Sequence, residues 1–396
     1  MRPTSTQSTN TNSENFAYLT EQLVTYIGNK RALLSFIVQG VEYVQTHLGK
    51  KKLVTFDVFS GSGIVSRFLK QHSSFVYAND LEYYASLISR CYLSNPSDED
   101  ITRLKKTYAK LNTSCAQKME QFLADENRFI NADITPGFIS QEYAPKNLSD
   151  IQKGERCFYT PYNACYLDCM RQCIADLVPQ KDQHYFIAPL LAEASIHANT
   201  GGVFKGFYKN SQTGIGKFGG NGENALSRIM GHIALPFPLF SSFNTDWDVF
   251  CQNANDLVHS DKNPAVDLAY IDPPYNQHPY GSNYFMLNLL AHYQMPQPET
   301  ISKVSGIPRD WNRSDYNKRA LSAQTFFDLV QNLNAKYLLI SFNNEGFISK
   351  KEMTQLLSKT GEVIVLESAY NTYRASRNLS ARNTHVKEYL YIVKKH

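Results

Sequence analysis

Residues 53–70 read LVTFDVFSGSGIVSRFLK, and this stretch decides the fold. The part LVTFDVF is apolar and rich in strand-forming side chains, SGSG is a glycine turn, and IVSRFLK has helical character. A strand that runs through a glycine turn into a helix is typical of sheets that bind nucleotides and related ligands. The turn alone is a weak signal, because some structural turns share it, and no GK[ST] follows that would make it a phosphate loop.

Further along the chain, other stretches favour strands. FVYAND at residues 75–80 ends in an acidic residue about twenty positions after the turn. The later stretches read VDLAYID (residues 266–272), AKYLLISF (residues 335–342), VIVLES (residues 363–368) and EYLYIV (residues 388–393). Strands that alternate with helices predict an α/β fold whose sheet is doubly wound and mainly parallel.

The rest of the chain divides by composition. Residues 1–16 are rich in Ser, Thr, Asn and Gln and predict a flexible tail. Residues 82–130 favour helices interrupted near SNPSDED, whereas residues 131–239 are expected to be irregular, with many Gly, Asn and aromatic residues. We therefore expect residues 17–95 and 240–396 to form the sheet domain, and residues 96–239 to be an insertion outside the sheet.

The overall composition is that of an ordinary globular protein. The chain has 396 residues, of which 42% are hydrophobic and 19% charged, enough to bury a large core. No stretch approaches the roughly 18 uninterrupted apolar residues of a membrane span, and the first residues lack the apolar centre of a secretory signal. We therefore expect a cytoplasmic protein with no membrane partner. The net charge of +4 permits binding to a polyanion without demonstrating it.

Basic residues gather in two segments. They are Lys205, Lys209, Lys217 and Arg228 in residues 199–231, against Glu223 alone, and Arg374, Arg377, Arg382 and Lys387 in residues 373–387. Such local excesses suit contacts with phosphates, although a solvated basic face explains either segment equally well.

The cysteines do not indicate a metal site or a disulfide framework. Their number, seven, is odd, and without a secretory signal it predicts reduced thiols. Cys165, Cys169 and Cys173, with Cys157 upstream, raise the question of a metal ligand set. Their four-residue spacing fits one face of a helix and lacks the CxxC pairs of zinc sites, so we expect buried thiols and no bound metal.

Residues 272–275, Asp-Pro-Pro-Tyr, directly follow an apolar strand. The prolines would end the strand and stiffen the loop, so a rigid turn is one interpretation. A catalytic interpretation explains more than a rigid turn does, because it gives each residue a task. The exocyclic amino nitrogen of adenine is a poor nucleophile, because its lone pair is delocalised into the ring. A carboxylate oxygen of Asp272 and the carbonyl of Pro273 can accept both amino hydrogens and point the lone pair at an electrophile. Tyr275 offers a face on which a flipped base stacks, worth roughly 1–3 kcal/mol.

Asp80 stands at a strand end, where a carboxylate can accept hydrogen bonds from ribose hydroxyls. A strand-end cap is the competing interpretation, and Asp80 alone does not decide between the two. Together with the glycine turn at the expected spacing, Asp80 favours a nucleoside ligand.

In their order along the chain, the motifs resemble those of the Dam-like N6-adenine DNA methyltransferases. The segments that carry the resemblance are TYIGNKRALLSFI, FDVFSGSG, YAND and YIDPPYNQHPYGSNY. The resemblance implies a seven-stranded methyltransferase sheet with an inserted target-recognition domain, S-adenosylmethionine as cofactor and adenine in double-stranded DNA as substrate. It also implies a prokaryotic modification enzyme that works beside a cognate restriction endonuclease. It implies neither the oligomeric state nor the recognition sequence.

The same resemblance assigns roles to individual residues. The cofactor residues are Tyr26, Lys30, Asp57, Ser60, Gly61, Gly63, Asp80 and Asp272, and the catalytic residues are Asp272, Pro273 and Tyr275. Family members often place an Asp before an Ala to hold the cofactor's adenine, and this chain has Asn253 at that position. The Asn253 side chain can still hydrogen-bond to an adenine edge. Asp133 is a second candidate for the same contact and ranks lower. The DNA-binding residues are Asn199, Lys205, Lys209, Lys217, Arg374, Arg377 and Arg382.

Several related functions share this chemistry. N4-cytosine methylation uses the same pocket but more often begins the tetrapeptide with Ser, and protein glutamine methylation more often begins it with Asn. RNA adenine is a further acceptor, although the long insertion favours duplex DNA. A catalytically silent DNA-recognition subunit is the alternative from another class, and the intact Asp272 and glycine turn count against it. We expect a direct in-line transfer that needs no cysteine nucleophile.

Overall fold

The computed structural model describes residues 14–21, 23–220, 224–371 and 385–396, so the predicted tail lies almost wholly outside the described residues. Residues 53–70 fold as expected into strand β1 (Leu53–Asp57), a turn and helix α3 (Ile64–Lys70). In the turn, Gly61 and Gly63 have φ angles of +50° and +75°, in the left-handed region that favours glycine. β1 lies between β2 (Ser73–Asp80) and β6 (Val266–Ile271) at the centre of the sheet.

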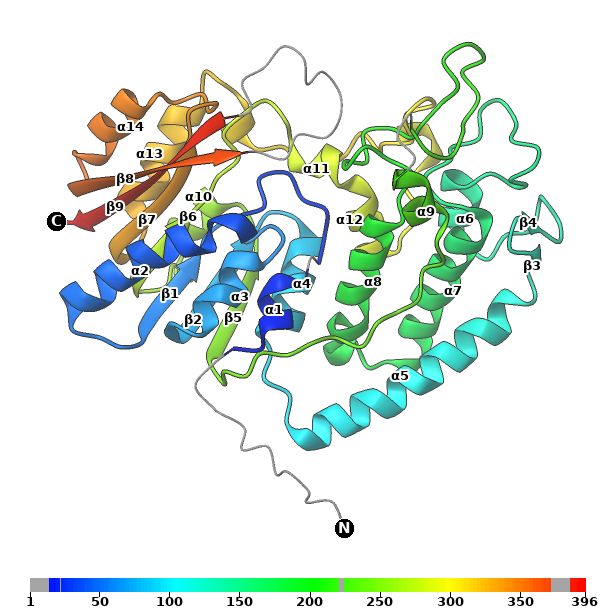
Figure 1. The fold of residues 1–396 in the computed structure, drawn as a ribbon, viewed down its shortest axis with the longest axis horizontal. Helices are drawn as coiled ribbons and strands as arrows, with labels where there is room; N and C mark the ends of the chain where they lie inside the picture. The colour runs from blue at the N-terminus through cyan, green and yellow to red at the C-terminus, as the bar shows by residue number, and fades with distance from the viewer. Residues whose placement is uncertain (1–13, 22, 221–223, 372–384) are drawn as a thin grey trace.

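The main sheet has seven strands in the order β5-β2-β1-β6-β7-β9-β8 (Figure 1). Its remaining strands are β5 (Asp246–Cys251), β7 (Ala335–Asn343), β8 (Gly361–Asn371) and β9 (His385–Lys395). β9 runs antiparallel to β7 and β8, while the other neighbours are parallel, so the predicted mainly parallel α/β sheet is confirmed. We did not predict β5, because it is an edge strand beside β2 and its sequence DWDVFC contains no apolar run.

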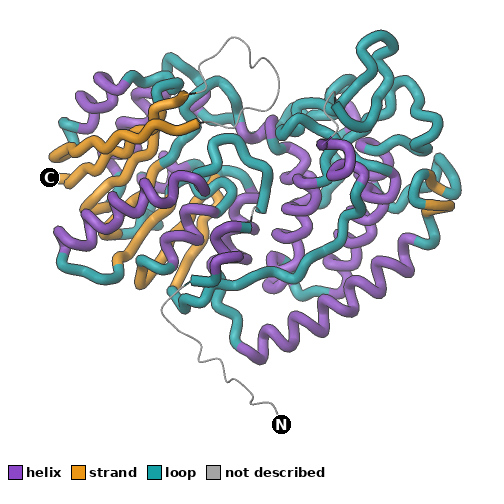
Figure 2. Tube along the Cα trace, viewed as in Figure 1, coloured by secondary structure: helices purple, strands orange, loops and turns teal. Residues whose placement is uncertain are grey.

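Helices cover both faces of the sheet, as a doubly wound fold requires (Figure 2). On one face lie α2 (Leu34–Leu48) and α3, and Phe36 of α2 shares a core cluster with Val76 of β2. The other face is covered by α10 (Ala254–Val258), α13 (Ser322–Asn332) and α14 (Lys350–Leu357), which share a core cluster with β1 and β7. With both faces covered, the ends of the strands are the places where the sheet can meet a ligand.

A helical body lies beside the sheet and comes mostly from residues 98–230 (Figure 1). Its elements are α5 (Asp98–Met119), β3 (Leu123–Asp125), β4 (Arg128–Phe129), α6 (Phe138–Tyr143), α7 (Pro161–Leu177), a short helix at Gln180–Asp182, α8 (His184–Ile196) and α9 (Asn224–Met230). The expectation that residues 131–239 are irregular is therefore wrong. α7 and α8 are buried nearly all round, so they lack the apolar stripe that marks a surface helix, and α8 contains Pro189.

α4 (Tyr83–Leu93) and α12 (Phe285–His292) join the helical body to the sheet. Both contribute side chains to the core cluster that also holds α7 and α8. The end of α12 is fixed by Tyr293, whose hydroxyl donates to Asp168 Oδ1 of α7 (2.7 Å). The helical body thus draws on segments from outside the insertion, and the division of the chain into domains stays a prediction.

The other described elements are α1 (Phe16–Thr20), α11 (Tyr280–Asn283) and short helices at Arg31–Leu33, Pro298–Thr300 and Asp315–Asn317. In the parts of the chain that the structure describes, no helix combines the length and apolar character needed to cross a membrane. Cys165, Cys169 and Cys173 lie buried on α7, as their spacing predicts. Within the described ranges, no group of three or more His, Cys, Asp and Glu side chains is placed to hold a metal ion.

Candidate active site

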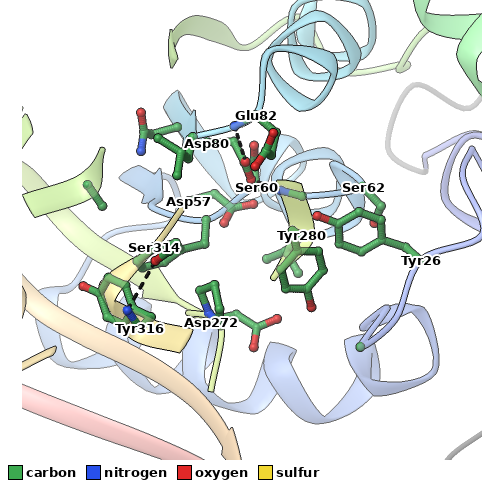
Figure 3. Close-up of a pocket in the computed structure, with 18 of the residues that line it drawn as sticks. Tyr26, Asp57, Ser60, Ser62, Asp80, Glu82, Asp272, Tyr280, Ser314 and Tyr316 are labelled. Atoms are coloured by element: carbon green, nitrogen blue, oxygen red, sulfur yellow. Dashed lines mark hydrogen bonds between the residues drawn. The ribbon is translucent and has the colours of Figure 1, made fainter. Parts of the chain in front are cut away.

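A pocket of about 900 Å³, counting its open mouth, lies at the carboxyl ends of the central strands. Asp57 is the last residue of β1, Asp80 is the last residue of β2, and Asp272 directly follows β6. Figure 3 shows the carboxyl groups of these three residues gathered around one space. Doubly wound sheets bind their ligands at this edge.

Most residues predicted to hold a cofactor line this pocket. They are Tyr26, Lys30, Asp57, Ser60, Gly61, Asp80, Asn253 and Asp272. Gly63, Pro273 and Tyr275 are not part of its wall: Gly63 caps the start of α3, and Tyr275 packs against β7. Asp133, the alternative to Asn253, is exposed in the helical body and lies outside the pocket wall.

The glycine turn forms one wall of the pocket. The Gly61 amide donates to Asp80 Oδ2 (2.8 Å), and the Gly63 amide donates to the Ser60 carbonyl (2.7 Å). A Cβ atom on Gly61 would stand 2.9 Å from the Tyr26 ring. Glycine is therefore required here both for the left-handed backbone and for the close approach of the ring.

Asp57 is a buried acid at the base of this turn. Ser66 Oγ of α3 donates to Asp57 Oδ2 (2.5 Å), whereas Oδ1 is buried without a hydrogen-bond partner among the described residues. Burial raises the pKa of Asp57 to about 7; the hydrogen bond from Ser66 opposes the rise, and the charges of Asp272 and Asp80 add to it. A buried acceptor without a partner is a place where a donor group of a ligand can bind.

Asp80 and Glu82 are two further buried acids in the pocket wall. Asp80 accepts backbone amides on both oxygens, from Gly61 and from Glu82 (2.9 Å), and Glu82 Oε2 accepts from the amides of Asn288 and Asn312. Burial raises the pKa of Asp80 to about 6 and that of Glu82 to about 7. We did not predict Glu82, although an acid two residues after a strand-end acid is a signal that could have found it.

Two tyrosines clamp the segment at residues 26–31. The Tyr26 ring stacks on Tyr280 and Tyr284, with 5.1 and 4.7 Å between ring centroids. The Ile27 amide donates to Tyr284 Oη (2.7 Å), and Tyr280 Oη donates to the Ile27 carbonyl (3.1 Å). Both tyrosines belong to the motif YIDPPYNQHPYGSNY, so one motif supplies the tetrapeptide and the clamp. Sequence reasoning assigned neither tyrosine a role.

A further wall comes from residues 312–317, which sequence reasoning missed. Its lining residues are Asn312, Ser314, Tyr316 and Asn317. Tyr316 packs edge-on against Phe59 of the glycine turn, with 5.3 Å between ring centroids. The segment is polar and without periodicity, so nothing in its sequence indicates a ligand contact.

Asp272 forms an ion pair with Lys30. Lys30 Nζ lies 3.1 Å from Asp272 Oδ1, and the side chains are only 4% and 18% exposed, respectively. Burial raises the pKa of Asp272, and the Lys30 charge opposes this rise. Burial by itself would lower the pKa of Lys30, but the charge of Asp272, together with smaller contributions from Tyr275, Glu388 and Tyr270, places the Lys30 pKa well above its ordinary value. The pair favours an ionised Asp272 at the pocket.

Tyr275 is anchored through its hydroxyl. Asn343 Nδ2 of β7 donates to Tyr275 Oη (3.0 Å), and the ring lies 5.3 Å from the Phe342 ring at an angle of 59°. Lys30 Nζ lies 5.8 Å from the Tyr275 ring centroid. The ring is therefore held in place beside the ion pair of Lys30 and Asp272.

The predicted DNA-binding lysines lie on the outside of the helical body. Lys205 and Lys209 are exposed and Lys217 is half-buried. His278 follows the tetrapeptide; burial lowers its pKa, and the Lys205 charge lowers it further. The charge of Lys205 thus acts on the loop that carries the catalytic candidates.

The prediction that Asn199 contacts DNA does not fit its place in the structure. It is fully buried, and its Nδ2 donates to the carbonyls of Cys157 (2.7 Å) and Lys217 (2.8 Å), while its Oδ1 accepts from the Gly219 amide (3.0 Å). An amide used in this way shapes the loop from inside and has no face toward DNA. Arg374, Arg377 and Arg382 lie outside the described residues.

The strand order, with antiparallel β9 between β7 and β8, and the pocket at the strand ends define the class of protein as an α/β methyltransferase. The chain belongs to the D12 class N6 adenine-specific DNA methyltransferases, whose family model matches residues 26–356. The family that the sequence motifs predicted is thus confirmed.

Relatives of the chain include methylases from bacteria and a virus. The chain is 28% identical over 381 residues to the type II methyltransferase M.NlaIII of Neisseria lactamica, covering 94% of this chain and 99% of that protein. It is 26% identical over 378 residues to the type II methyltransferase M.CviAII of Paramecium bursaria Chlorella virus 1, with 93% and 98% covered. It is also 28% identical over 381 residues to the modification methylase StsI of Streptococcus sanguinis, matching 93% of this chain but only 52% of StsI.

Proposed function

We propose that this chain is a site-specific DNA methyltransferase that transfers a methyl group from S-adenosylmethionine to N6 of an adenine flipped out of duplex DNA. The observation that carries the proposal is that one pocket joins the glycine turn, Asp57 and Asp80 to the Asp272 carboxyl group. The family and the relatives favour a modification enzyme that works beside a cognate restriction endonuclease.

The residues around the pocket fit this cofactor. Asp57 Oδ1, buried and without a partner in the described chain, suits an ammonium group such as the α-amino group of the methionine moiety. Asp80 and Glu82 offer carboxyl oxygens to ribose hydroxyls, and Asn253 after β5 offers its amide to an adenine edge. When bound, the cofactor supplies a methyl group that its sulfonium charge makes electrophilic.

Asp272 and Pro273 prepare the acceptor nitrogen. The Asp272 carboxylate accepts one amino hydrogen and the Pro273 carbonyl accepts the other, so the lone pair is drawn out of the ring and aimed at the methyl group. Lys30 favours the ionised form of Asp272, and Tyr275 offers its ring to the base. This arrangement would let the nitrogen form its bond to the methyl group as the methyl–sulfur bond breaks, with no covalent enzyme intermediate, and the amino proton would then pass to water.

Phosphate contacts are proposed for the basic residues at the surface. These are Lys205, Lys209 and Lys217 of the helical body and Arg374, Arg377 and Arg382 of the segment before β9. The effect of the Lys205 charge, which lowers the pKa of His278, supports this, because positive charge then acts on the loop that follows the tetrapeptide. Affinity for DNA should then fall as salt rises, and a flat salt response would contradict these contacts.

Transfer of a tritiated methyl group to DNA, RNA and protein, followed by nucleoside digestion, tests the proposed function. Label recovered as N6-methyladenine from duplex DNA is the expected result. Label in N4-methylcytosine, RNA or protein would overturn the choice of acceptor. Absence of both transfer and saturable cofactor binding in calorimetry would instead identify a silent DNA-recognition subunit.

A further inference from the structure

Glu388 is a buried acid that the proposed mechanism does not use. It lies on β9 opposite Asn343 of β7 in the antiparallel register, and it is only 3% exposed. It is not part of the pocket wall, and its Oε2 is buried without a hydrogen-bond partner in the described part of the chain. A carboxyl group in such a place is costly unless neighbouring charges and dipoles compensate it.

Asn343 connects Glu388 to Tyr275. The side chains of Asn343 and Glu388 are neighbours on one face of the sheet, because the two residues stand directly opposite each other in the antiparallel register. Asn343 Nδ2 donates to Tyr275 Oη (3.0 Å). Its Oδ1 accepts from the Glu345 amide (3.0 Å), so both ends of the amide are engaged. Glu388 therefore lies beside the amide that anchors the Tyr275 ring.

The charge of Glu388 also acts on the ion pair of Lys30 and Asp272. The charges of Asp272 and Glu388 both raise the pKa of Lys30, whose ammonium lies 3.1 Å from Asp272 Oδ1. Burial raises the pKa of Glu388; the Lys30 charge opposes this rise, and the charges of Asp272 and Glu345 add to it.

We propose that Glu388 is a positioning residue of the methyltransferase site, which holds the Tyr275 ring in place through Asn343. This inference rests on the proposed role of Tyr275. Glu388 is not part of the pocket wall, so it acts on the transfer step by keeping the contact between Asn343 and Tyr275 in place. Its loss should therefore slow the transfer itself and leave the binding of cofactor and DNA nearly unchanged.

Glu388→Gln tests this proposal, because it keeps the size of the side chain and removes its charge. We expect the single-turnover rate of methyl transfer to fall at least about tenfold. Cofactor affinity by calorimetry and DNA affinity by fluorescence anisotropy should stay within about twofold of the wild-type values. The wild-type enzyme, measured in the same series, tests the proposed function separately. If the wild type transfers no methyl group, the proposed function is contradicted. If the wild type and Glu388→Gln transfer at equal rates, only the role of Glu388 is contradicted.

Asp267→Asn is the matched control for a general loss of stability. Asp267 is also a buried acid of the sheet, paired with Lys50 (2.8 Å) and Lys336 (2.9 Å) at the opposite end of β6. This variant should lower the melting temperature without changing the transfer rate. If the two variants have equal melting temperatures and lose the same amount of transfer rate, the proposal is overturned.

Asn343→Ala provides a second, independent test. If Glu388 and Asn343 share one path to Tyr275, the double variant should lose less rate than the product of the two single losses. A double variant whose loss equals that product would show that the two residues act separately, and it would overturn the link through Asn343.

Discussion

Lys30→Met removes the ammonium that lies 3.1 Å from Asp272 Oδ1 while it keeps a long apolar side chain. Asp272 is then a buried acid whose pKa burial already raises. In the wild-type protein the Lys30 charge opposes that rise, so its removal moves the Asp272 pKa further upward. Below the new pKa the carboxyl group is neutral and is a weaker acceptor for the amino hydrogen of the base.

The burial of the pair sets the size of the effect on stability. Breaking a buried ion pair costs about 3–5 kcal/mol where the remaining charge stays ionised. Because the Asp272 side chain is still 18% exposed, we expect the lower end, about 3 kcal/mol. An acid whose folded-state pKa lies above its unfolded value loses stability as pH rises from the unfolded to the folded pKa, and the loss is constant above the folded pKa. The loss should therefore be larger at high pH than at low pH, and about pH 5 and about pH 9 are suitable for the comparison.

Urea unfolding at both pH values measures the stability, and single-turnover methyl transfer over the same range measures the rate. We expect the rate of the variant to rise with pH along a curve displaced to higher pH than that of the wild type. Lys336→Met is the control: Lys336 is 59% exposed, and its partner Asp267 retains Lys50, so the loss should stay below about 1 kcal/mol. Equal stability losses at both pH values together with an undisplaced rate curve would refute the role of the ion pair.

Other substitutions test the remaining parts of the site. Asp272→Ala should reduce methyl incorporation into DNA by roughly 10²–10³-fold or more with an unchanged circular dichroism spectrum, and near-normal turnover would contradict the mechanism. Gly61→Ala should weaken cofactor binding in calorimetry about tenfold, because its Cβ would stand 2.9 Å from the Tyr26 ring. Gly49→Ala is the control: the Gly49 backbone is also left-handed, but nothing lies within 4 Å of the added Cβ, so cofactor binding should be unchanged. Lys205→Ala should lower the slope of log affinity against log salt by about one, and an unaltered slope would argue against a phosphate contact.

The sequence by itself determined the sheet and the chemistry of its strand ends. The apolar stretches at β1, β2, β6, β7, β8 and β9 are local features, as are the left-handed glycines of the turn and the tetrapeptide after β6. Each depends on the conformational preferences of a few adjacent residues, so short windows of sequence are enough to recognise them. The order of those motifs also predicted the family, which the match to residues 26–356 confirmed.

Only the tertiary structure decided which side chains meet at the pocket. β5 is an edge strand held by its pairing with β2, and α7 and α8 are buried on all sides, so neither the strand nor the helices show a period in sequence. Ile27 and Tyr284 are 257 positions apart, yet their hydrogen bond fixes the clamp around Tyr26. The ion pair of Lys30 with Asp272 is of the same kind. Such contacts arise from packing between distant segments, and local propensity carries no record of which segments will pack together.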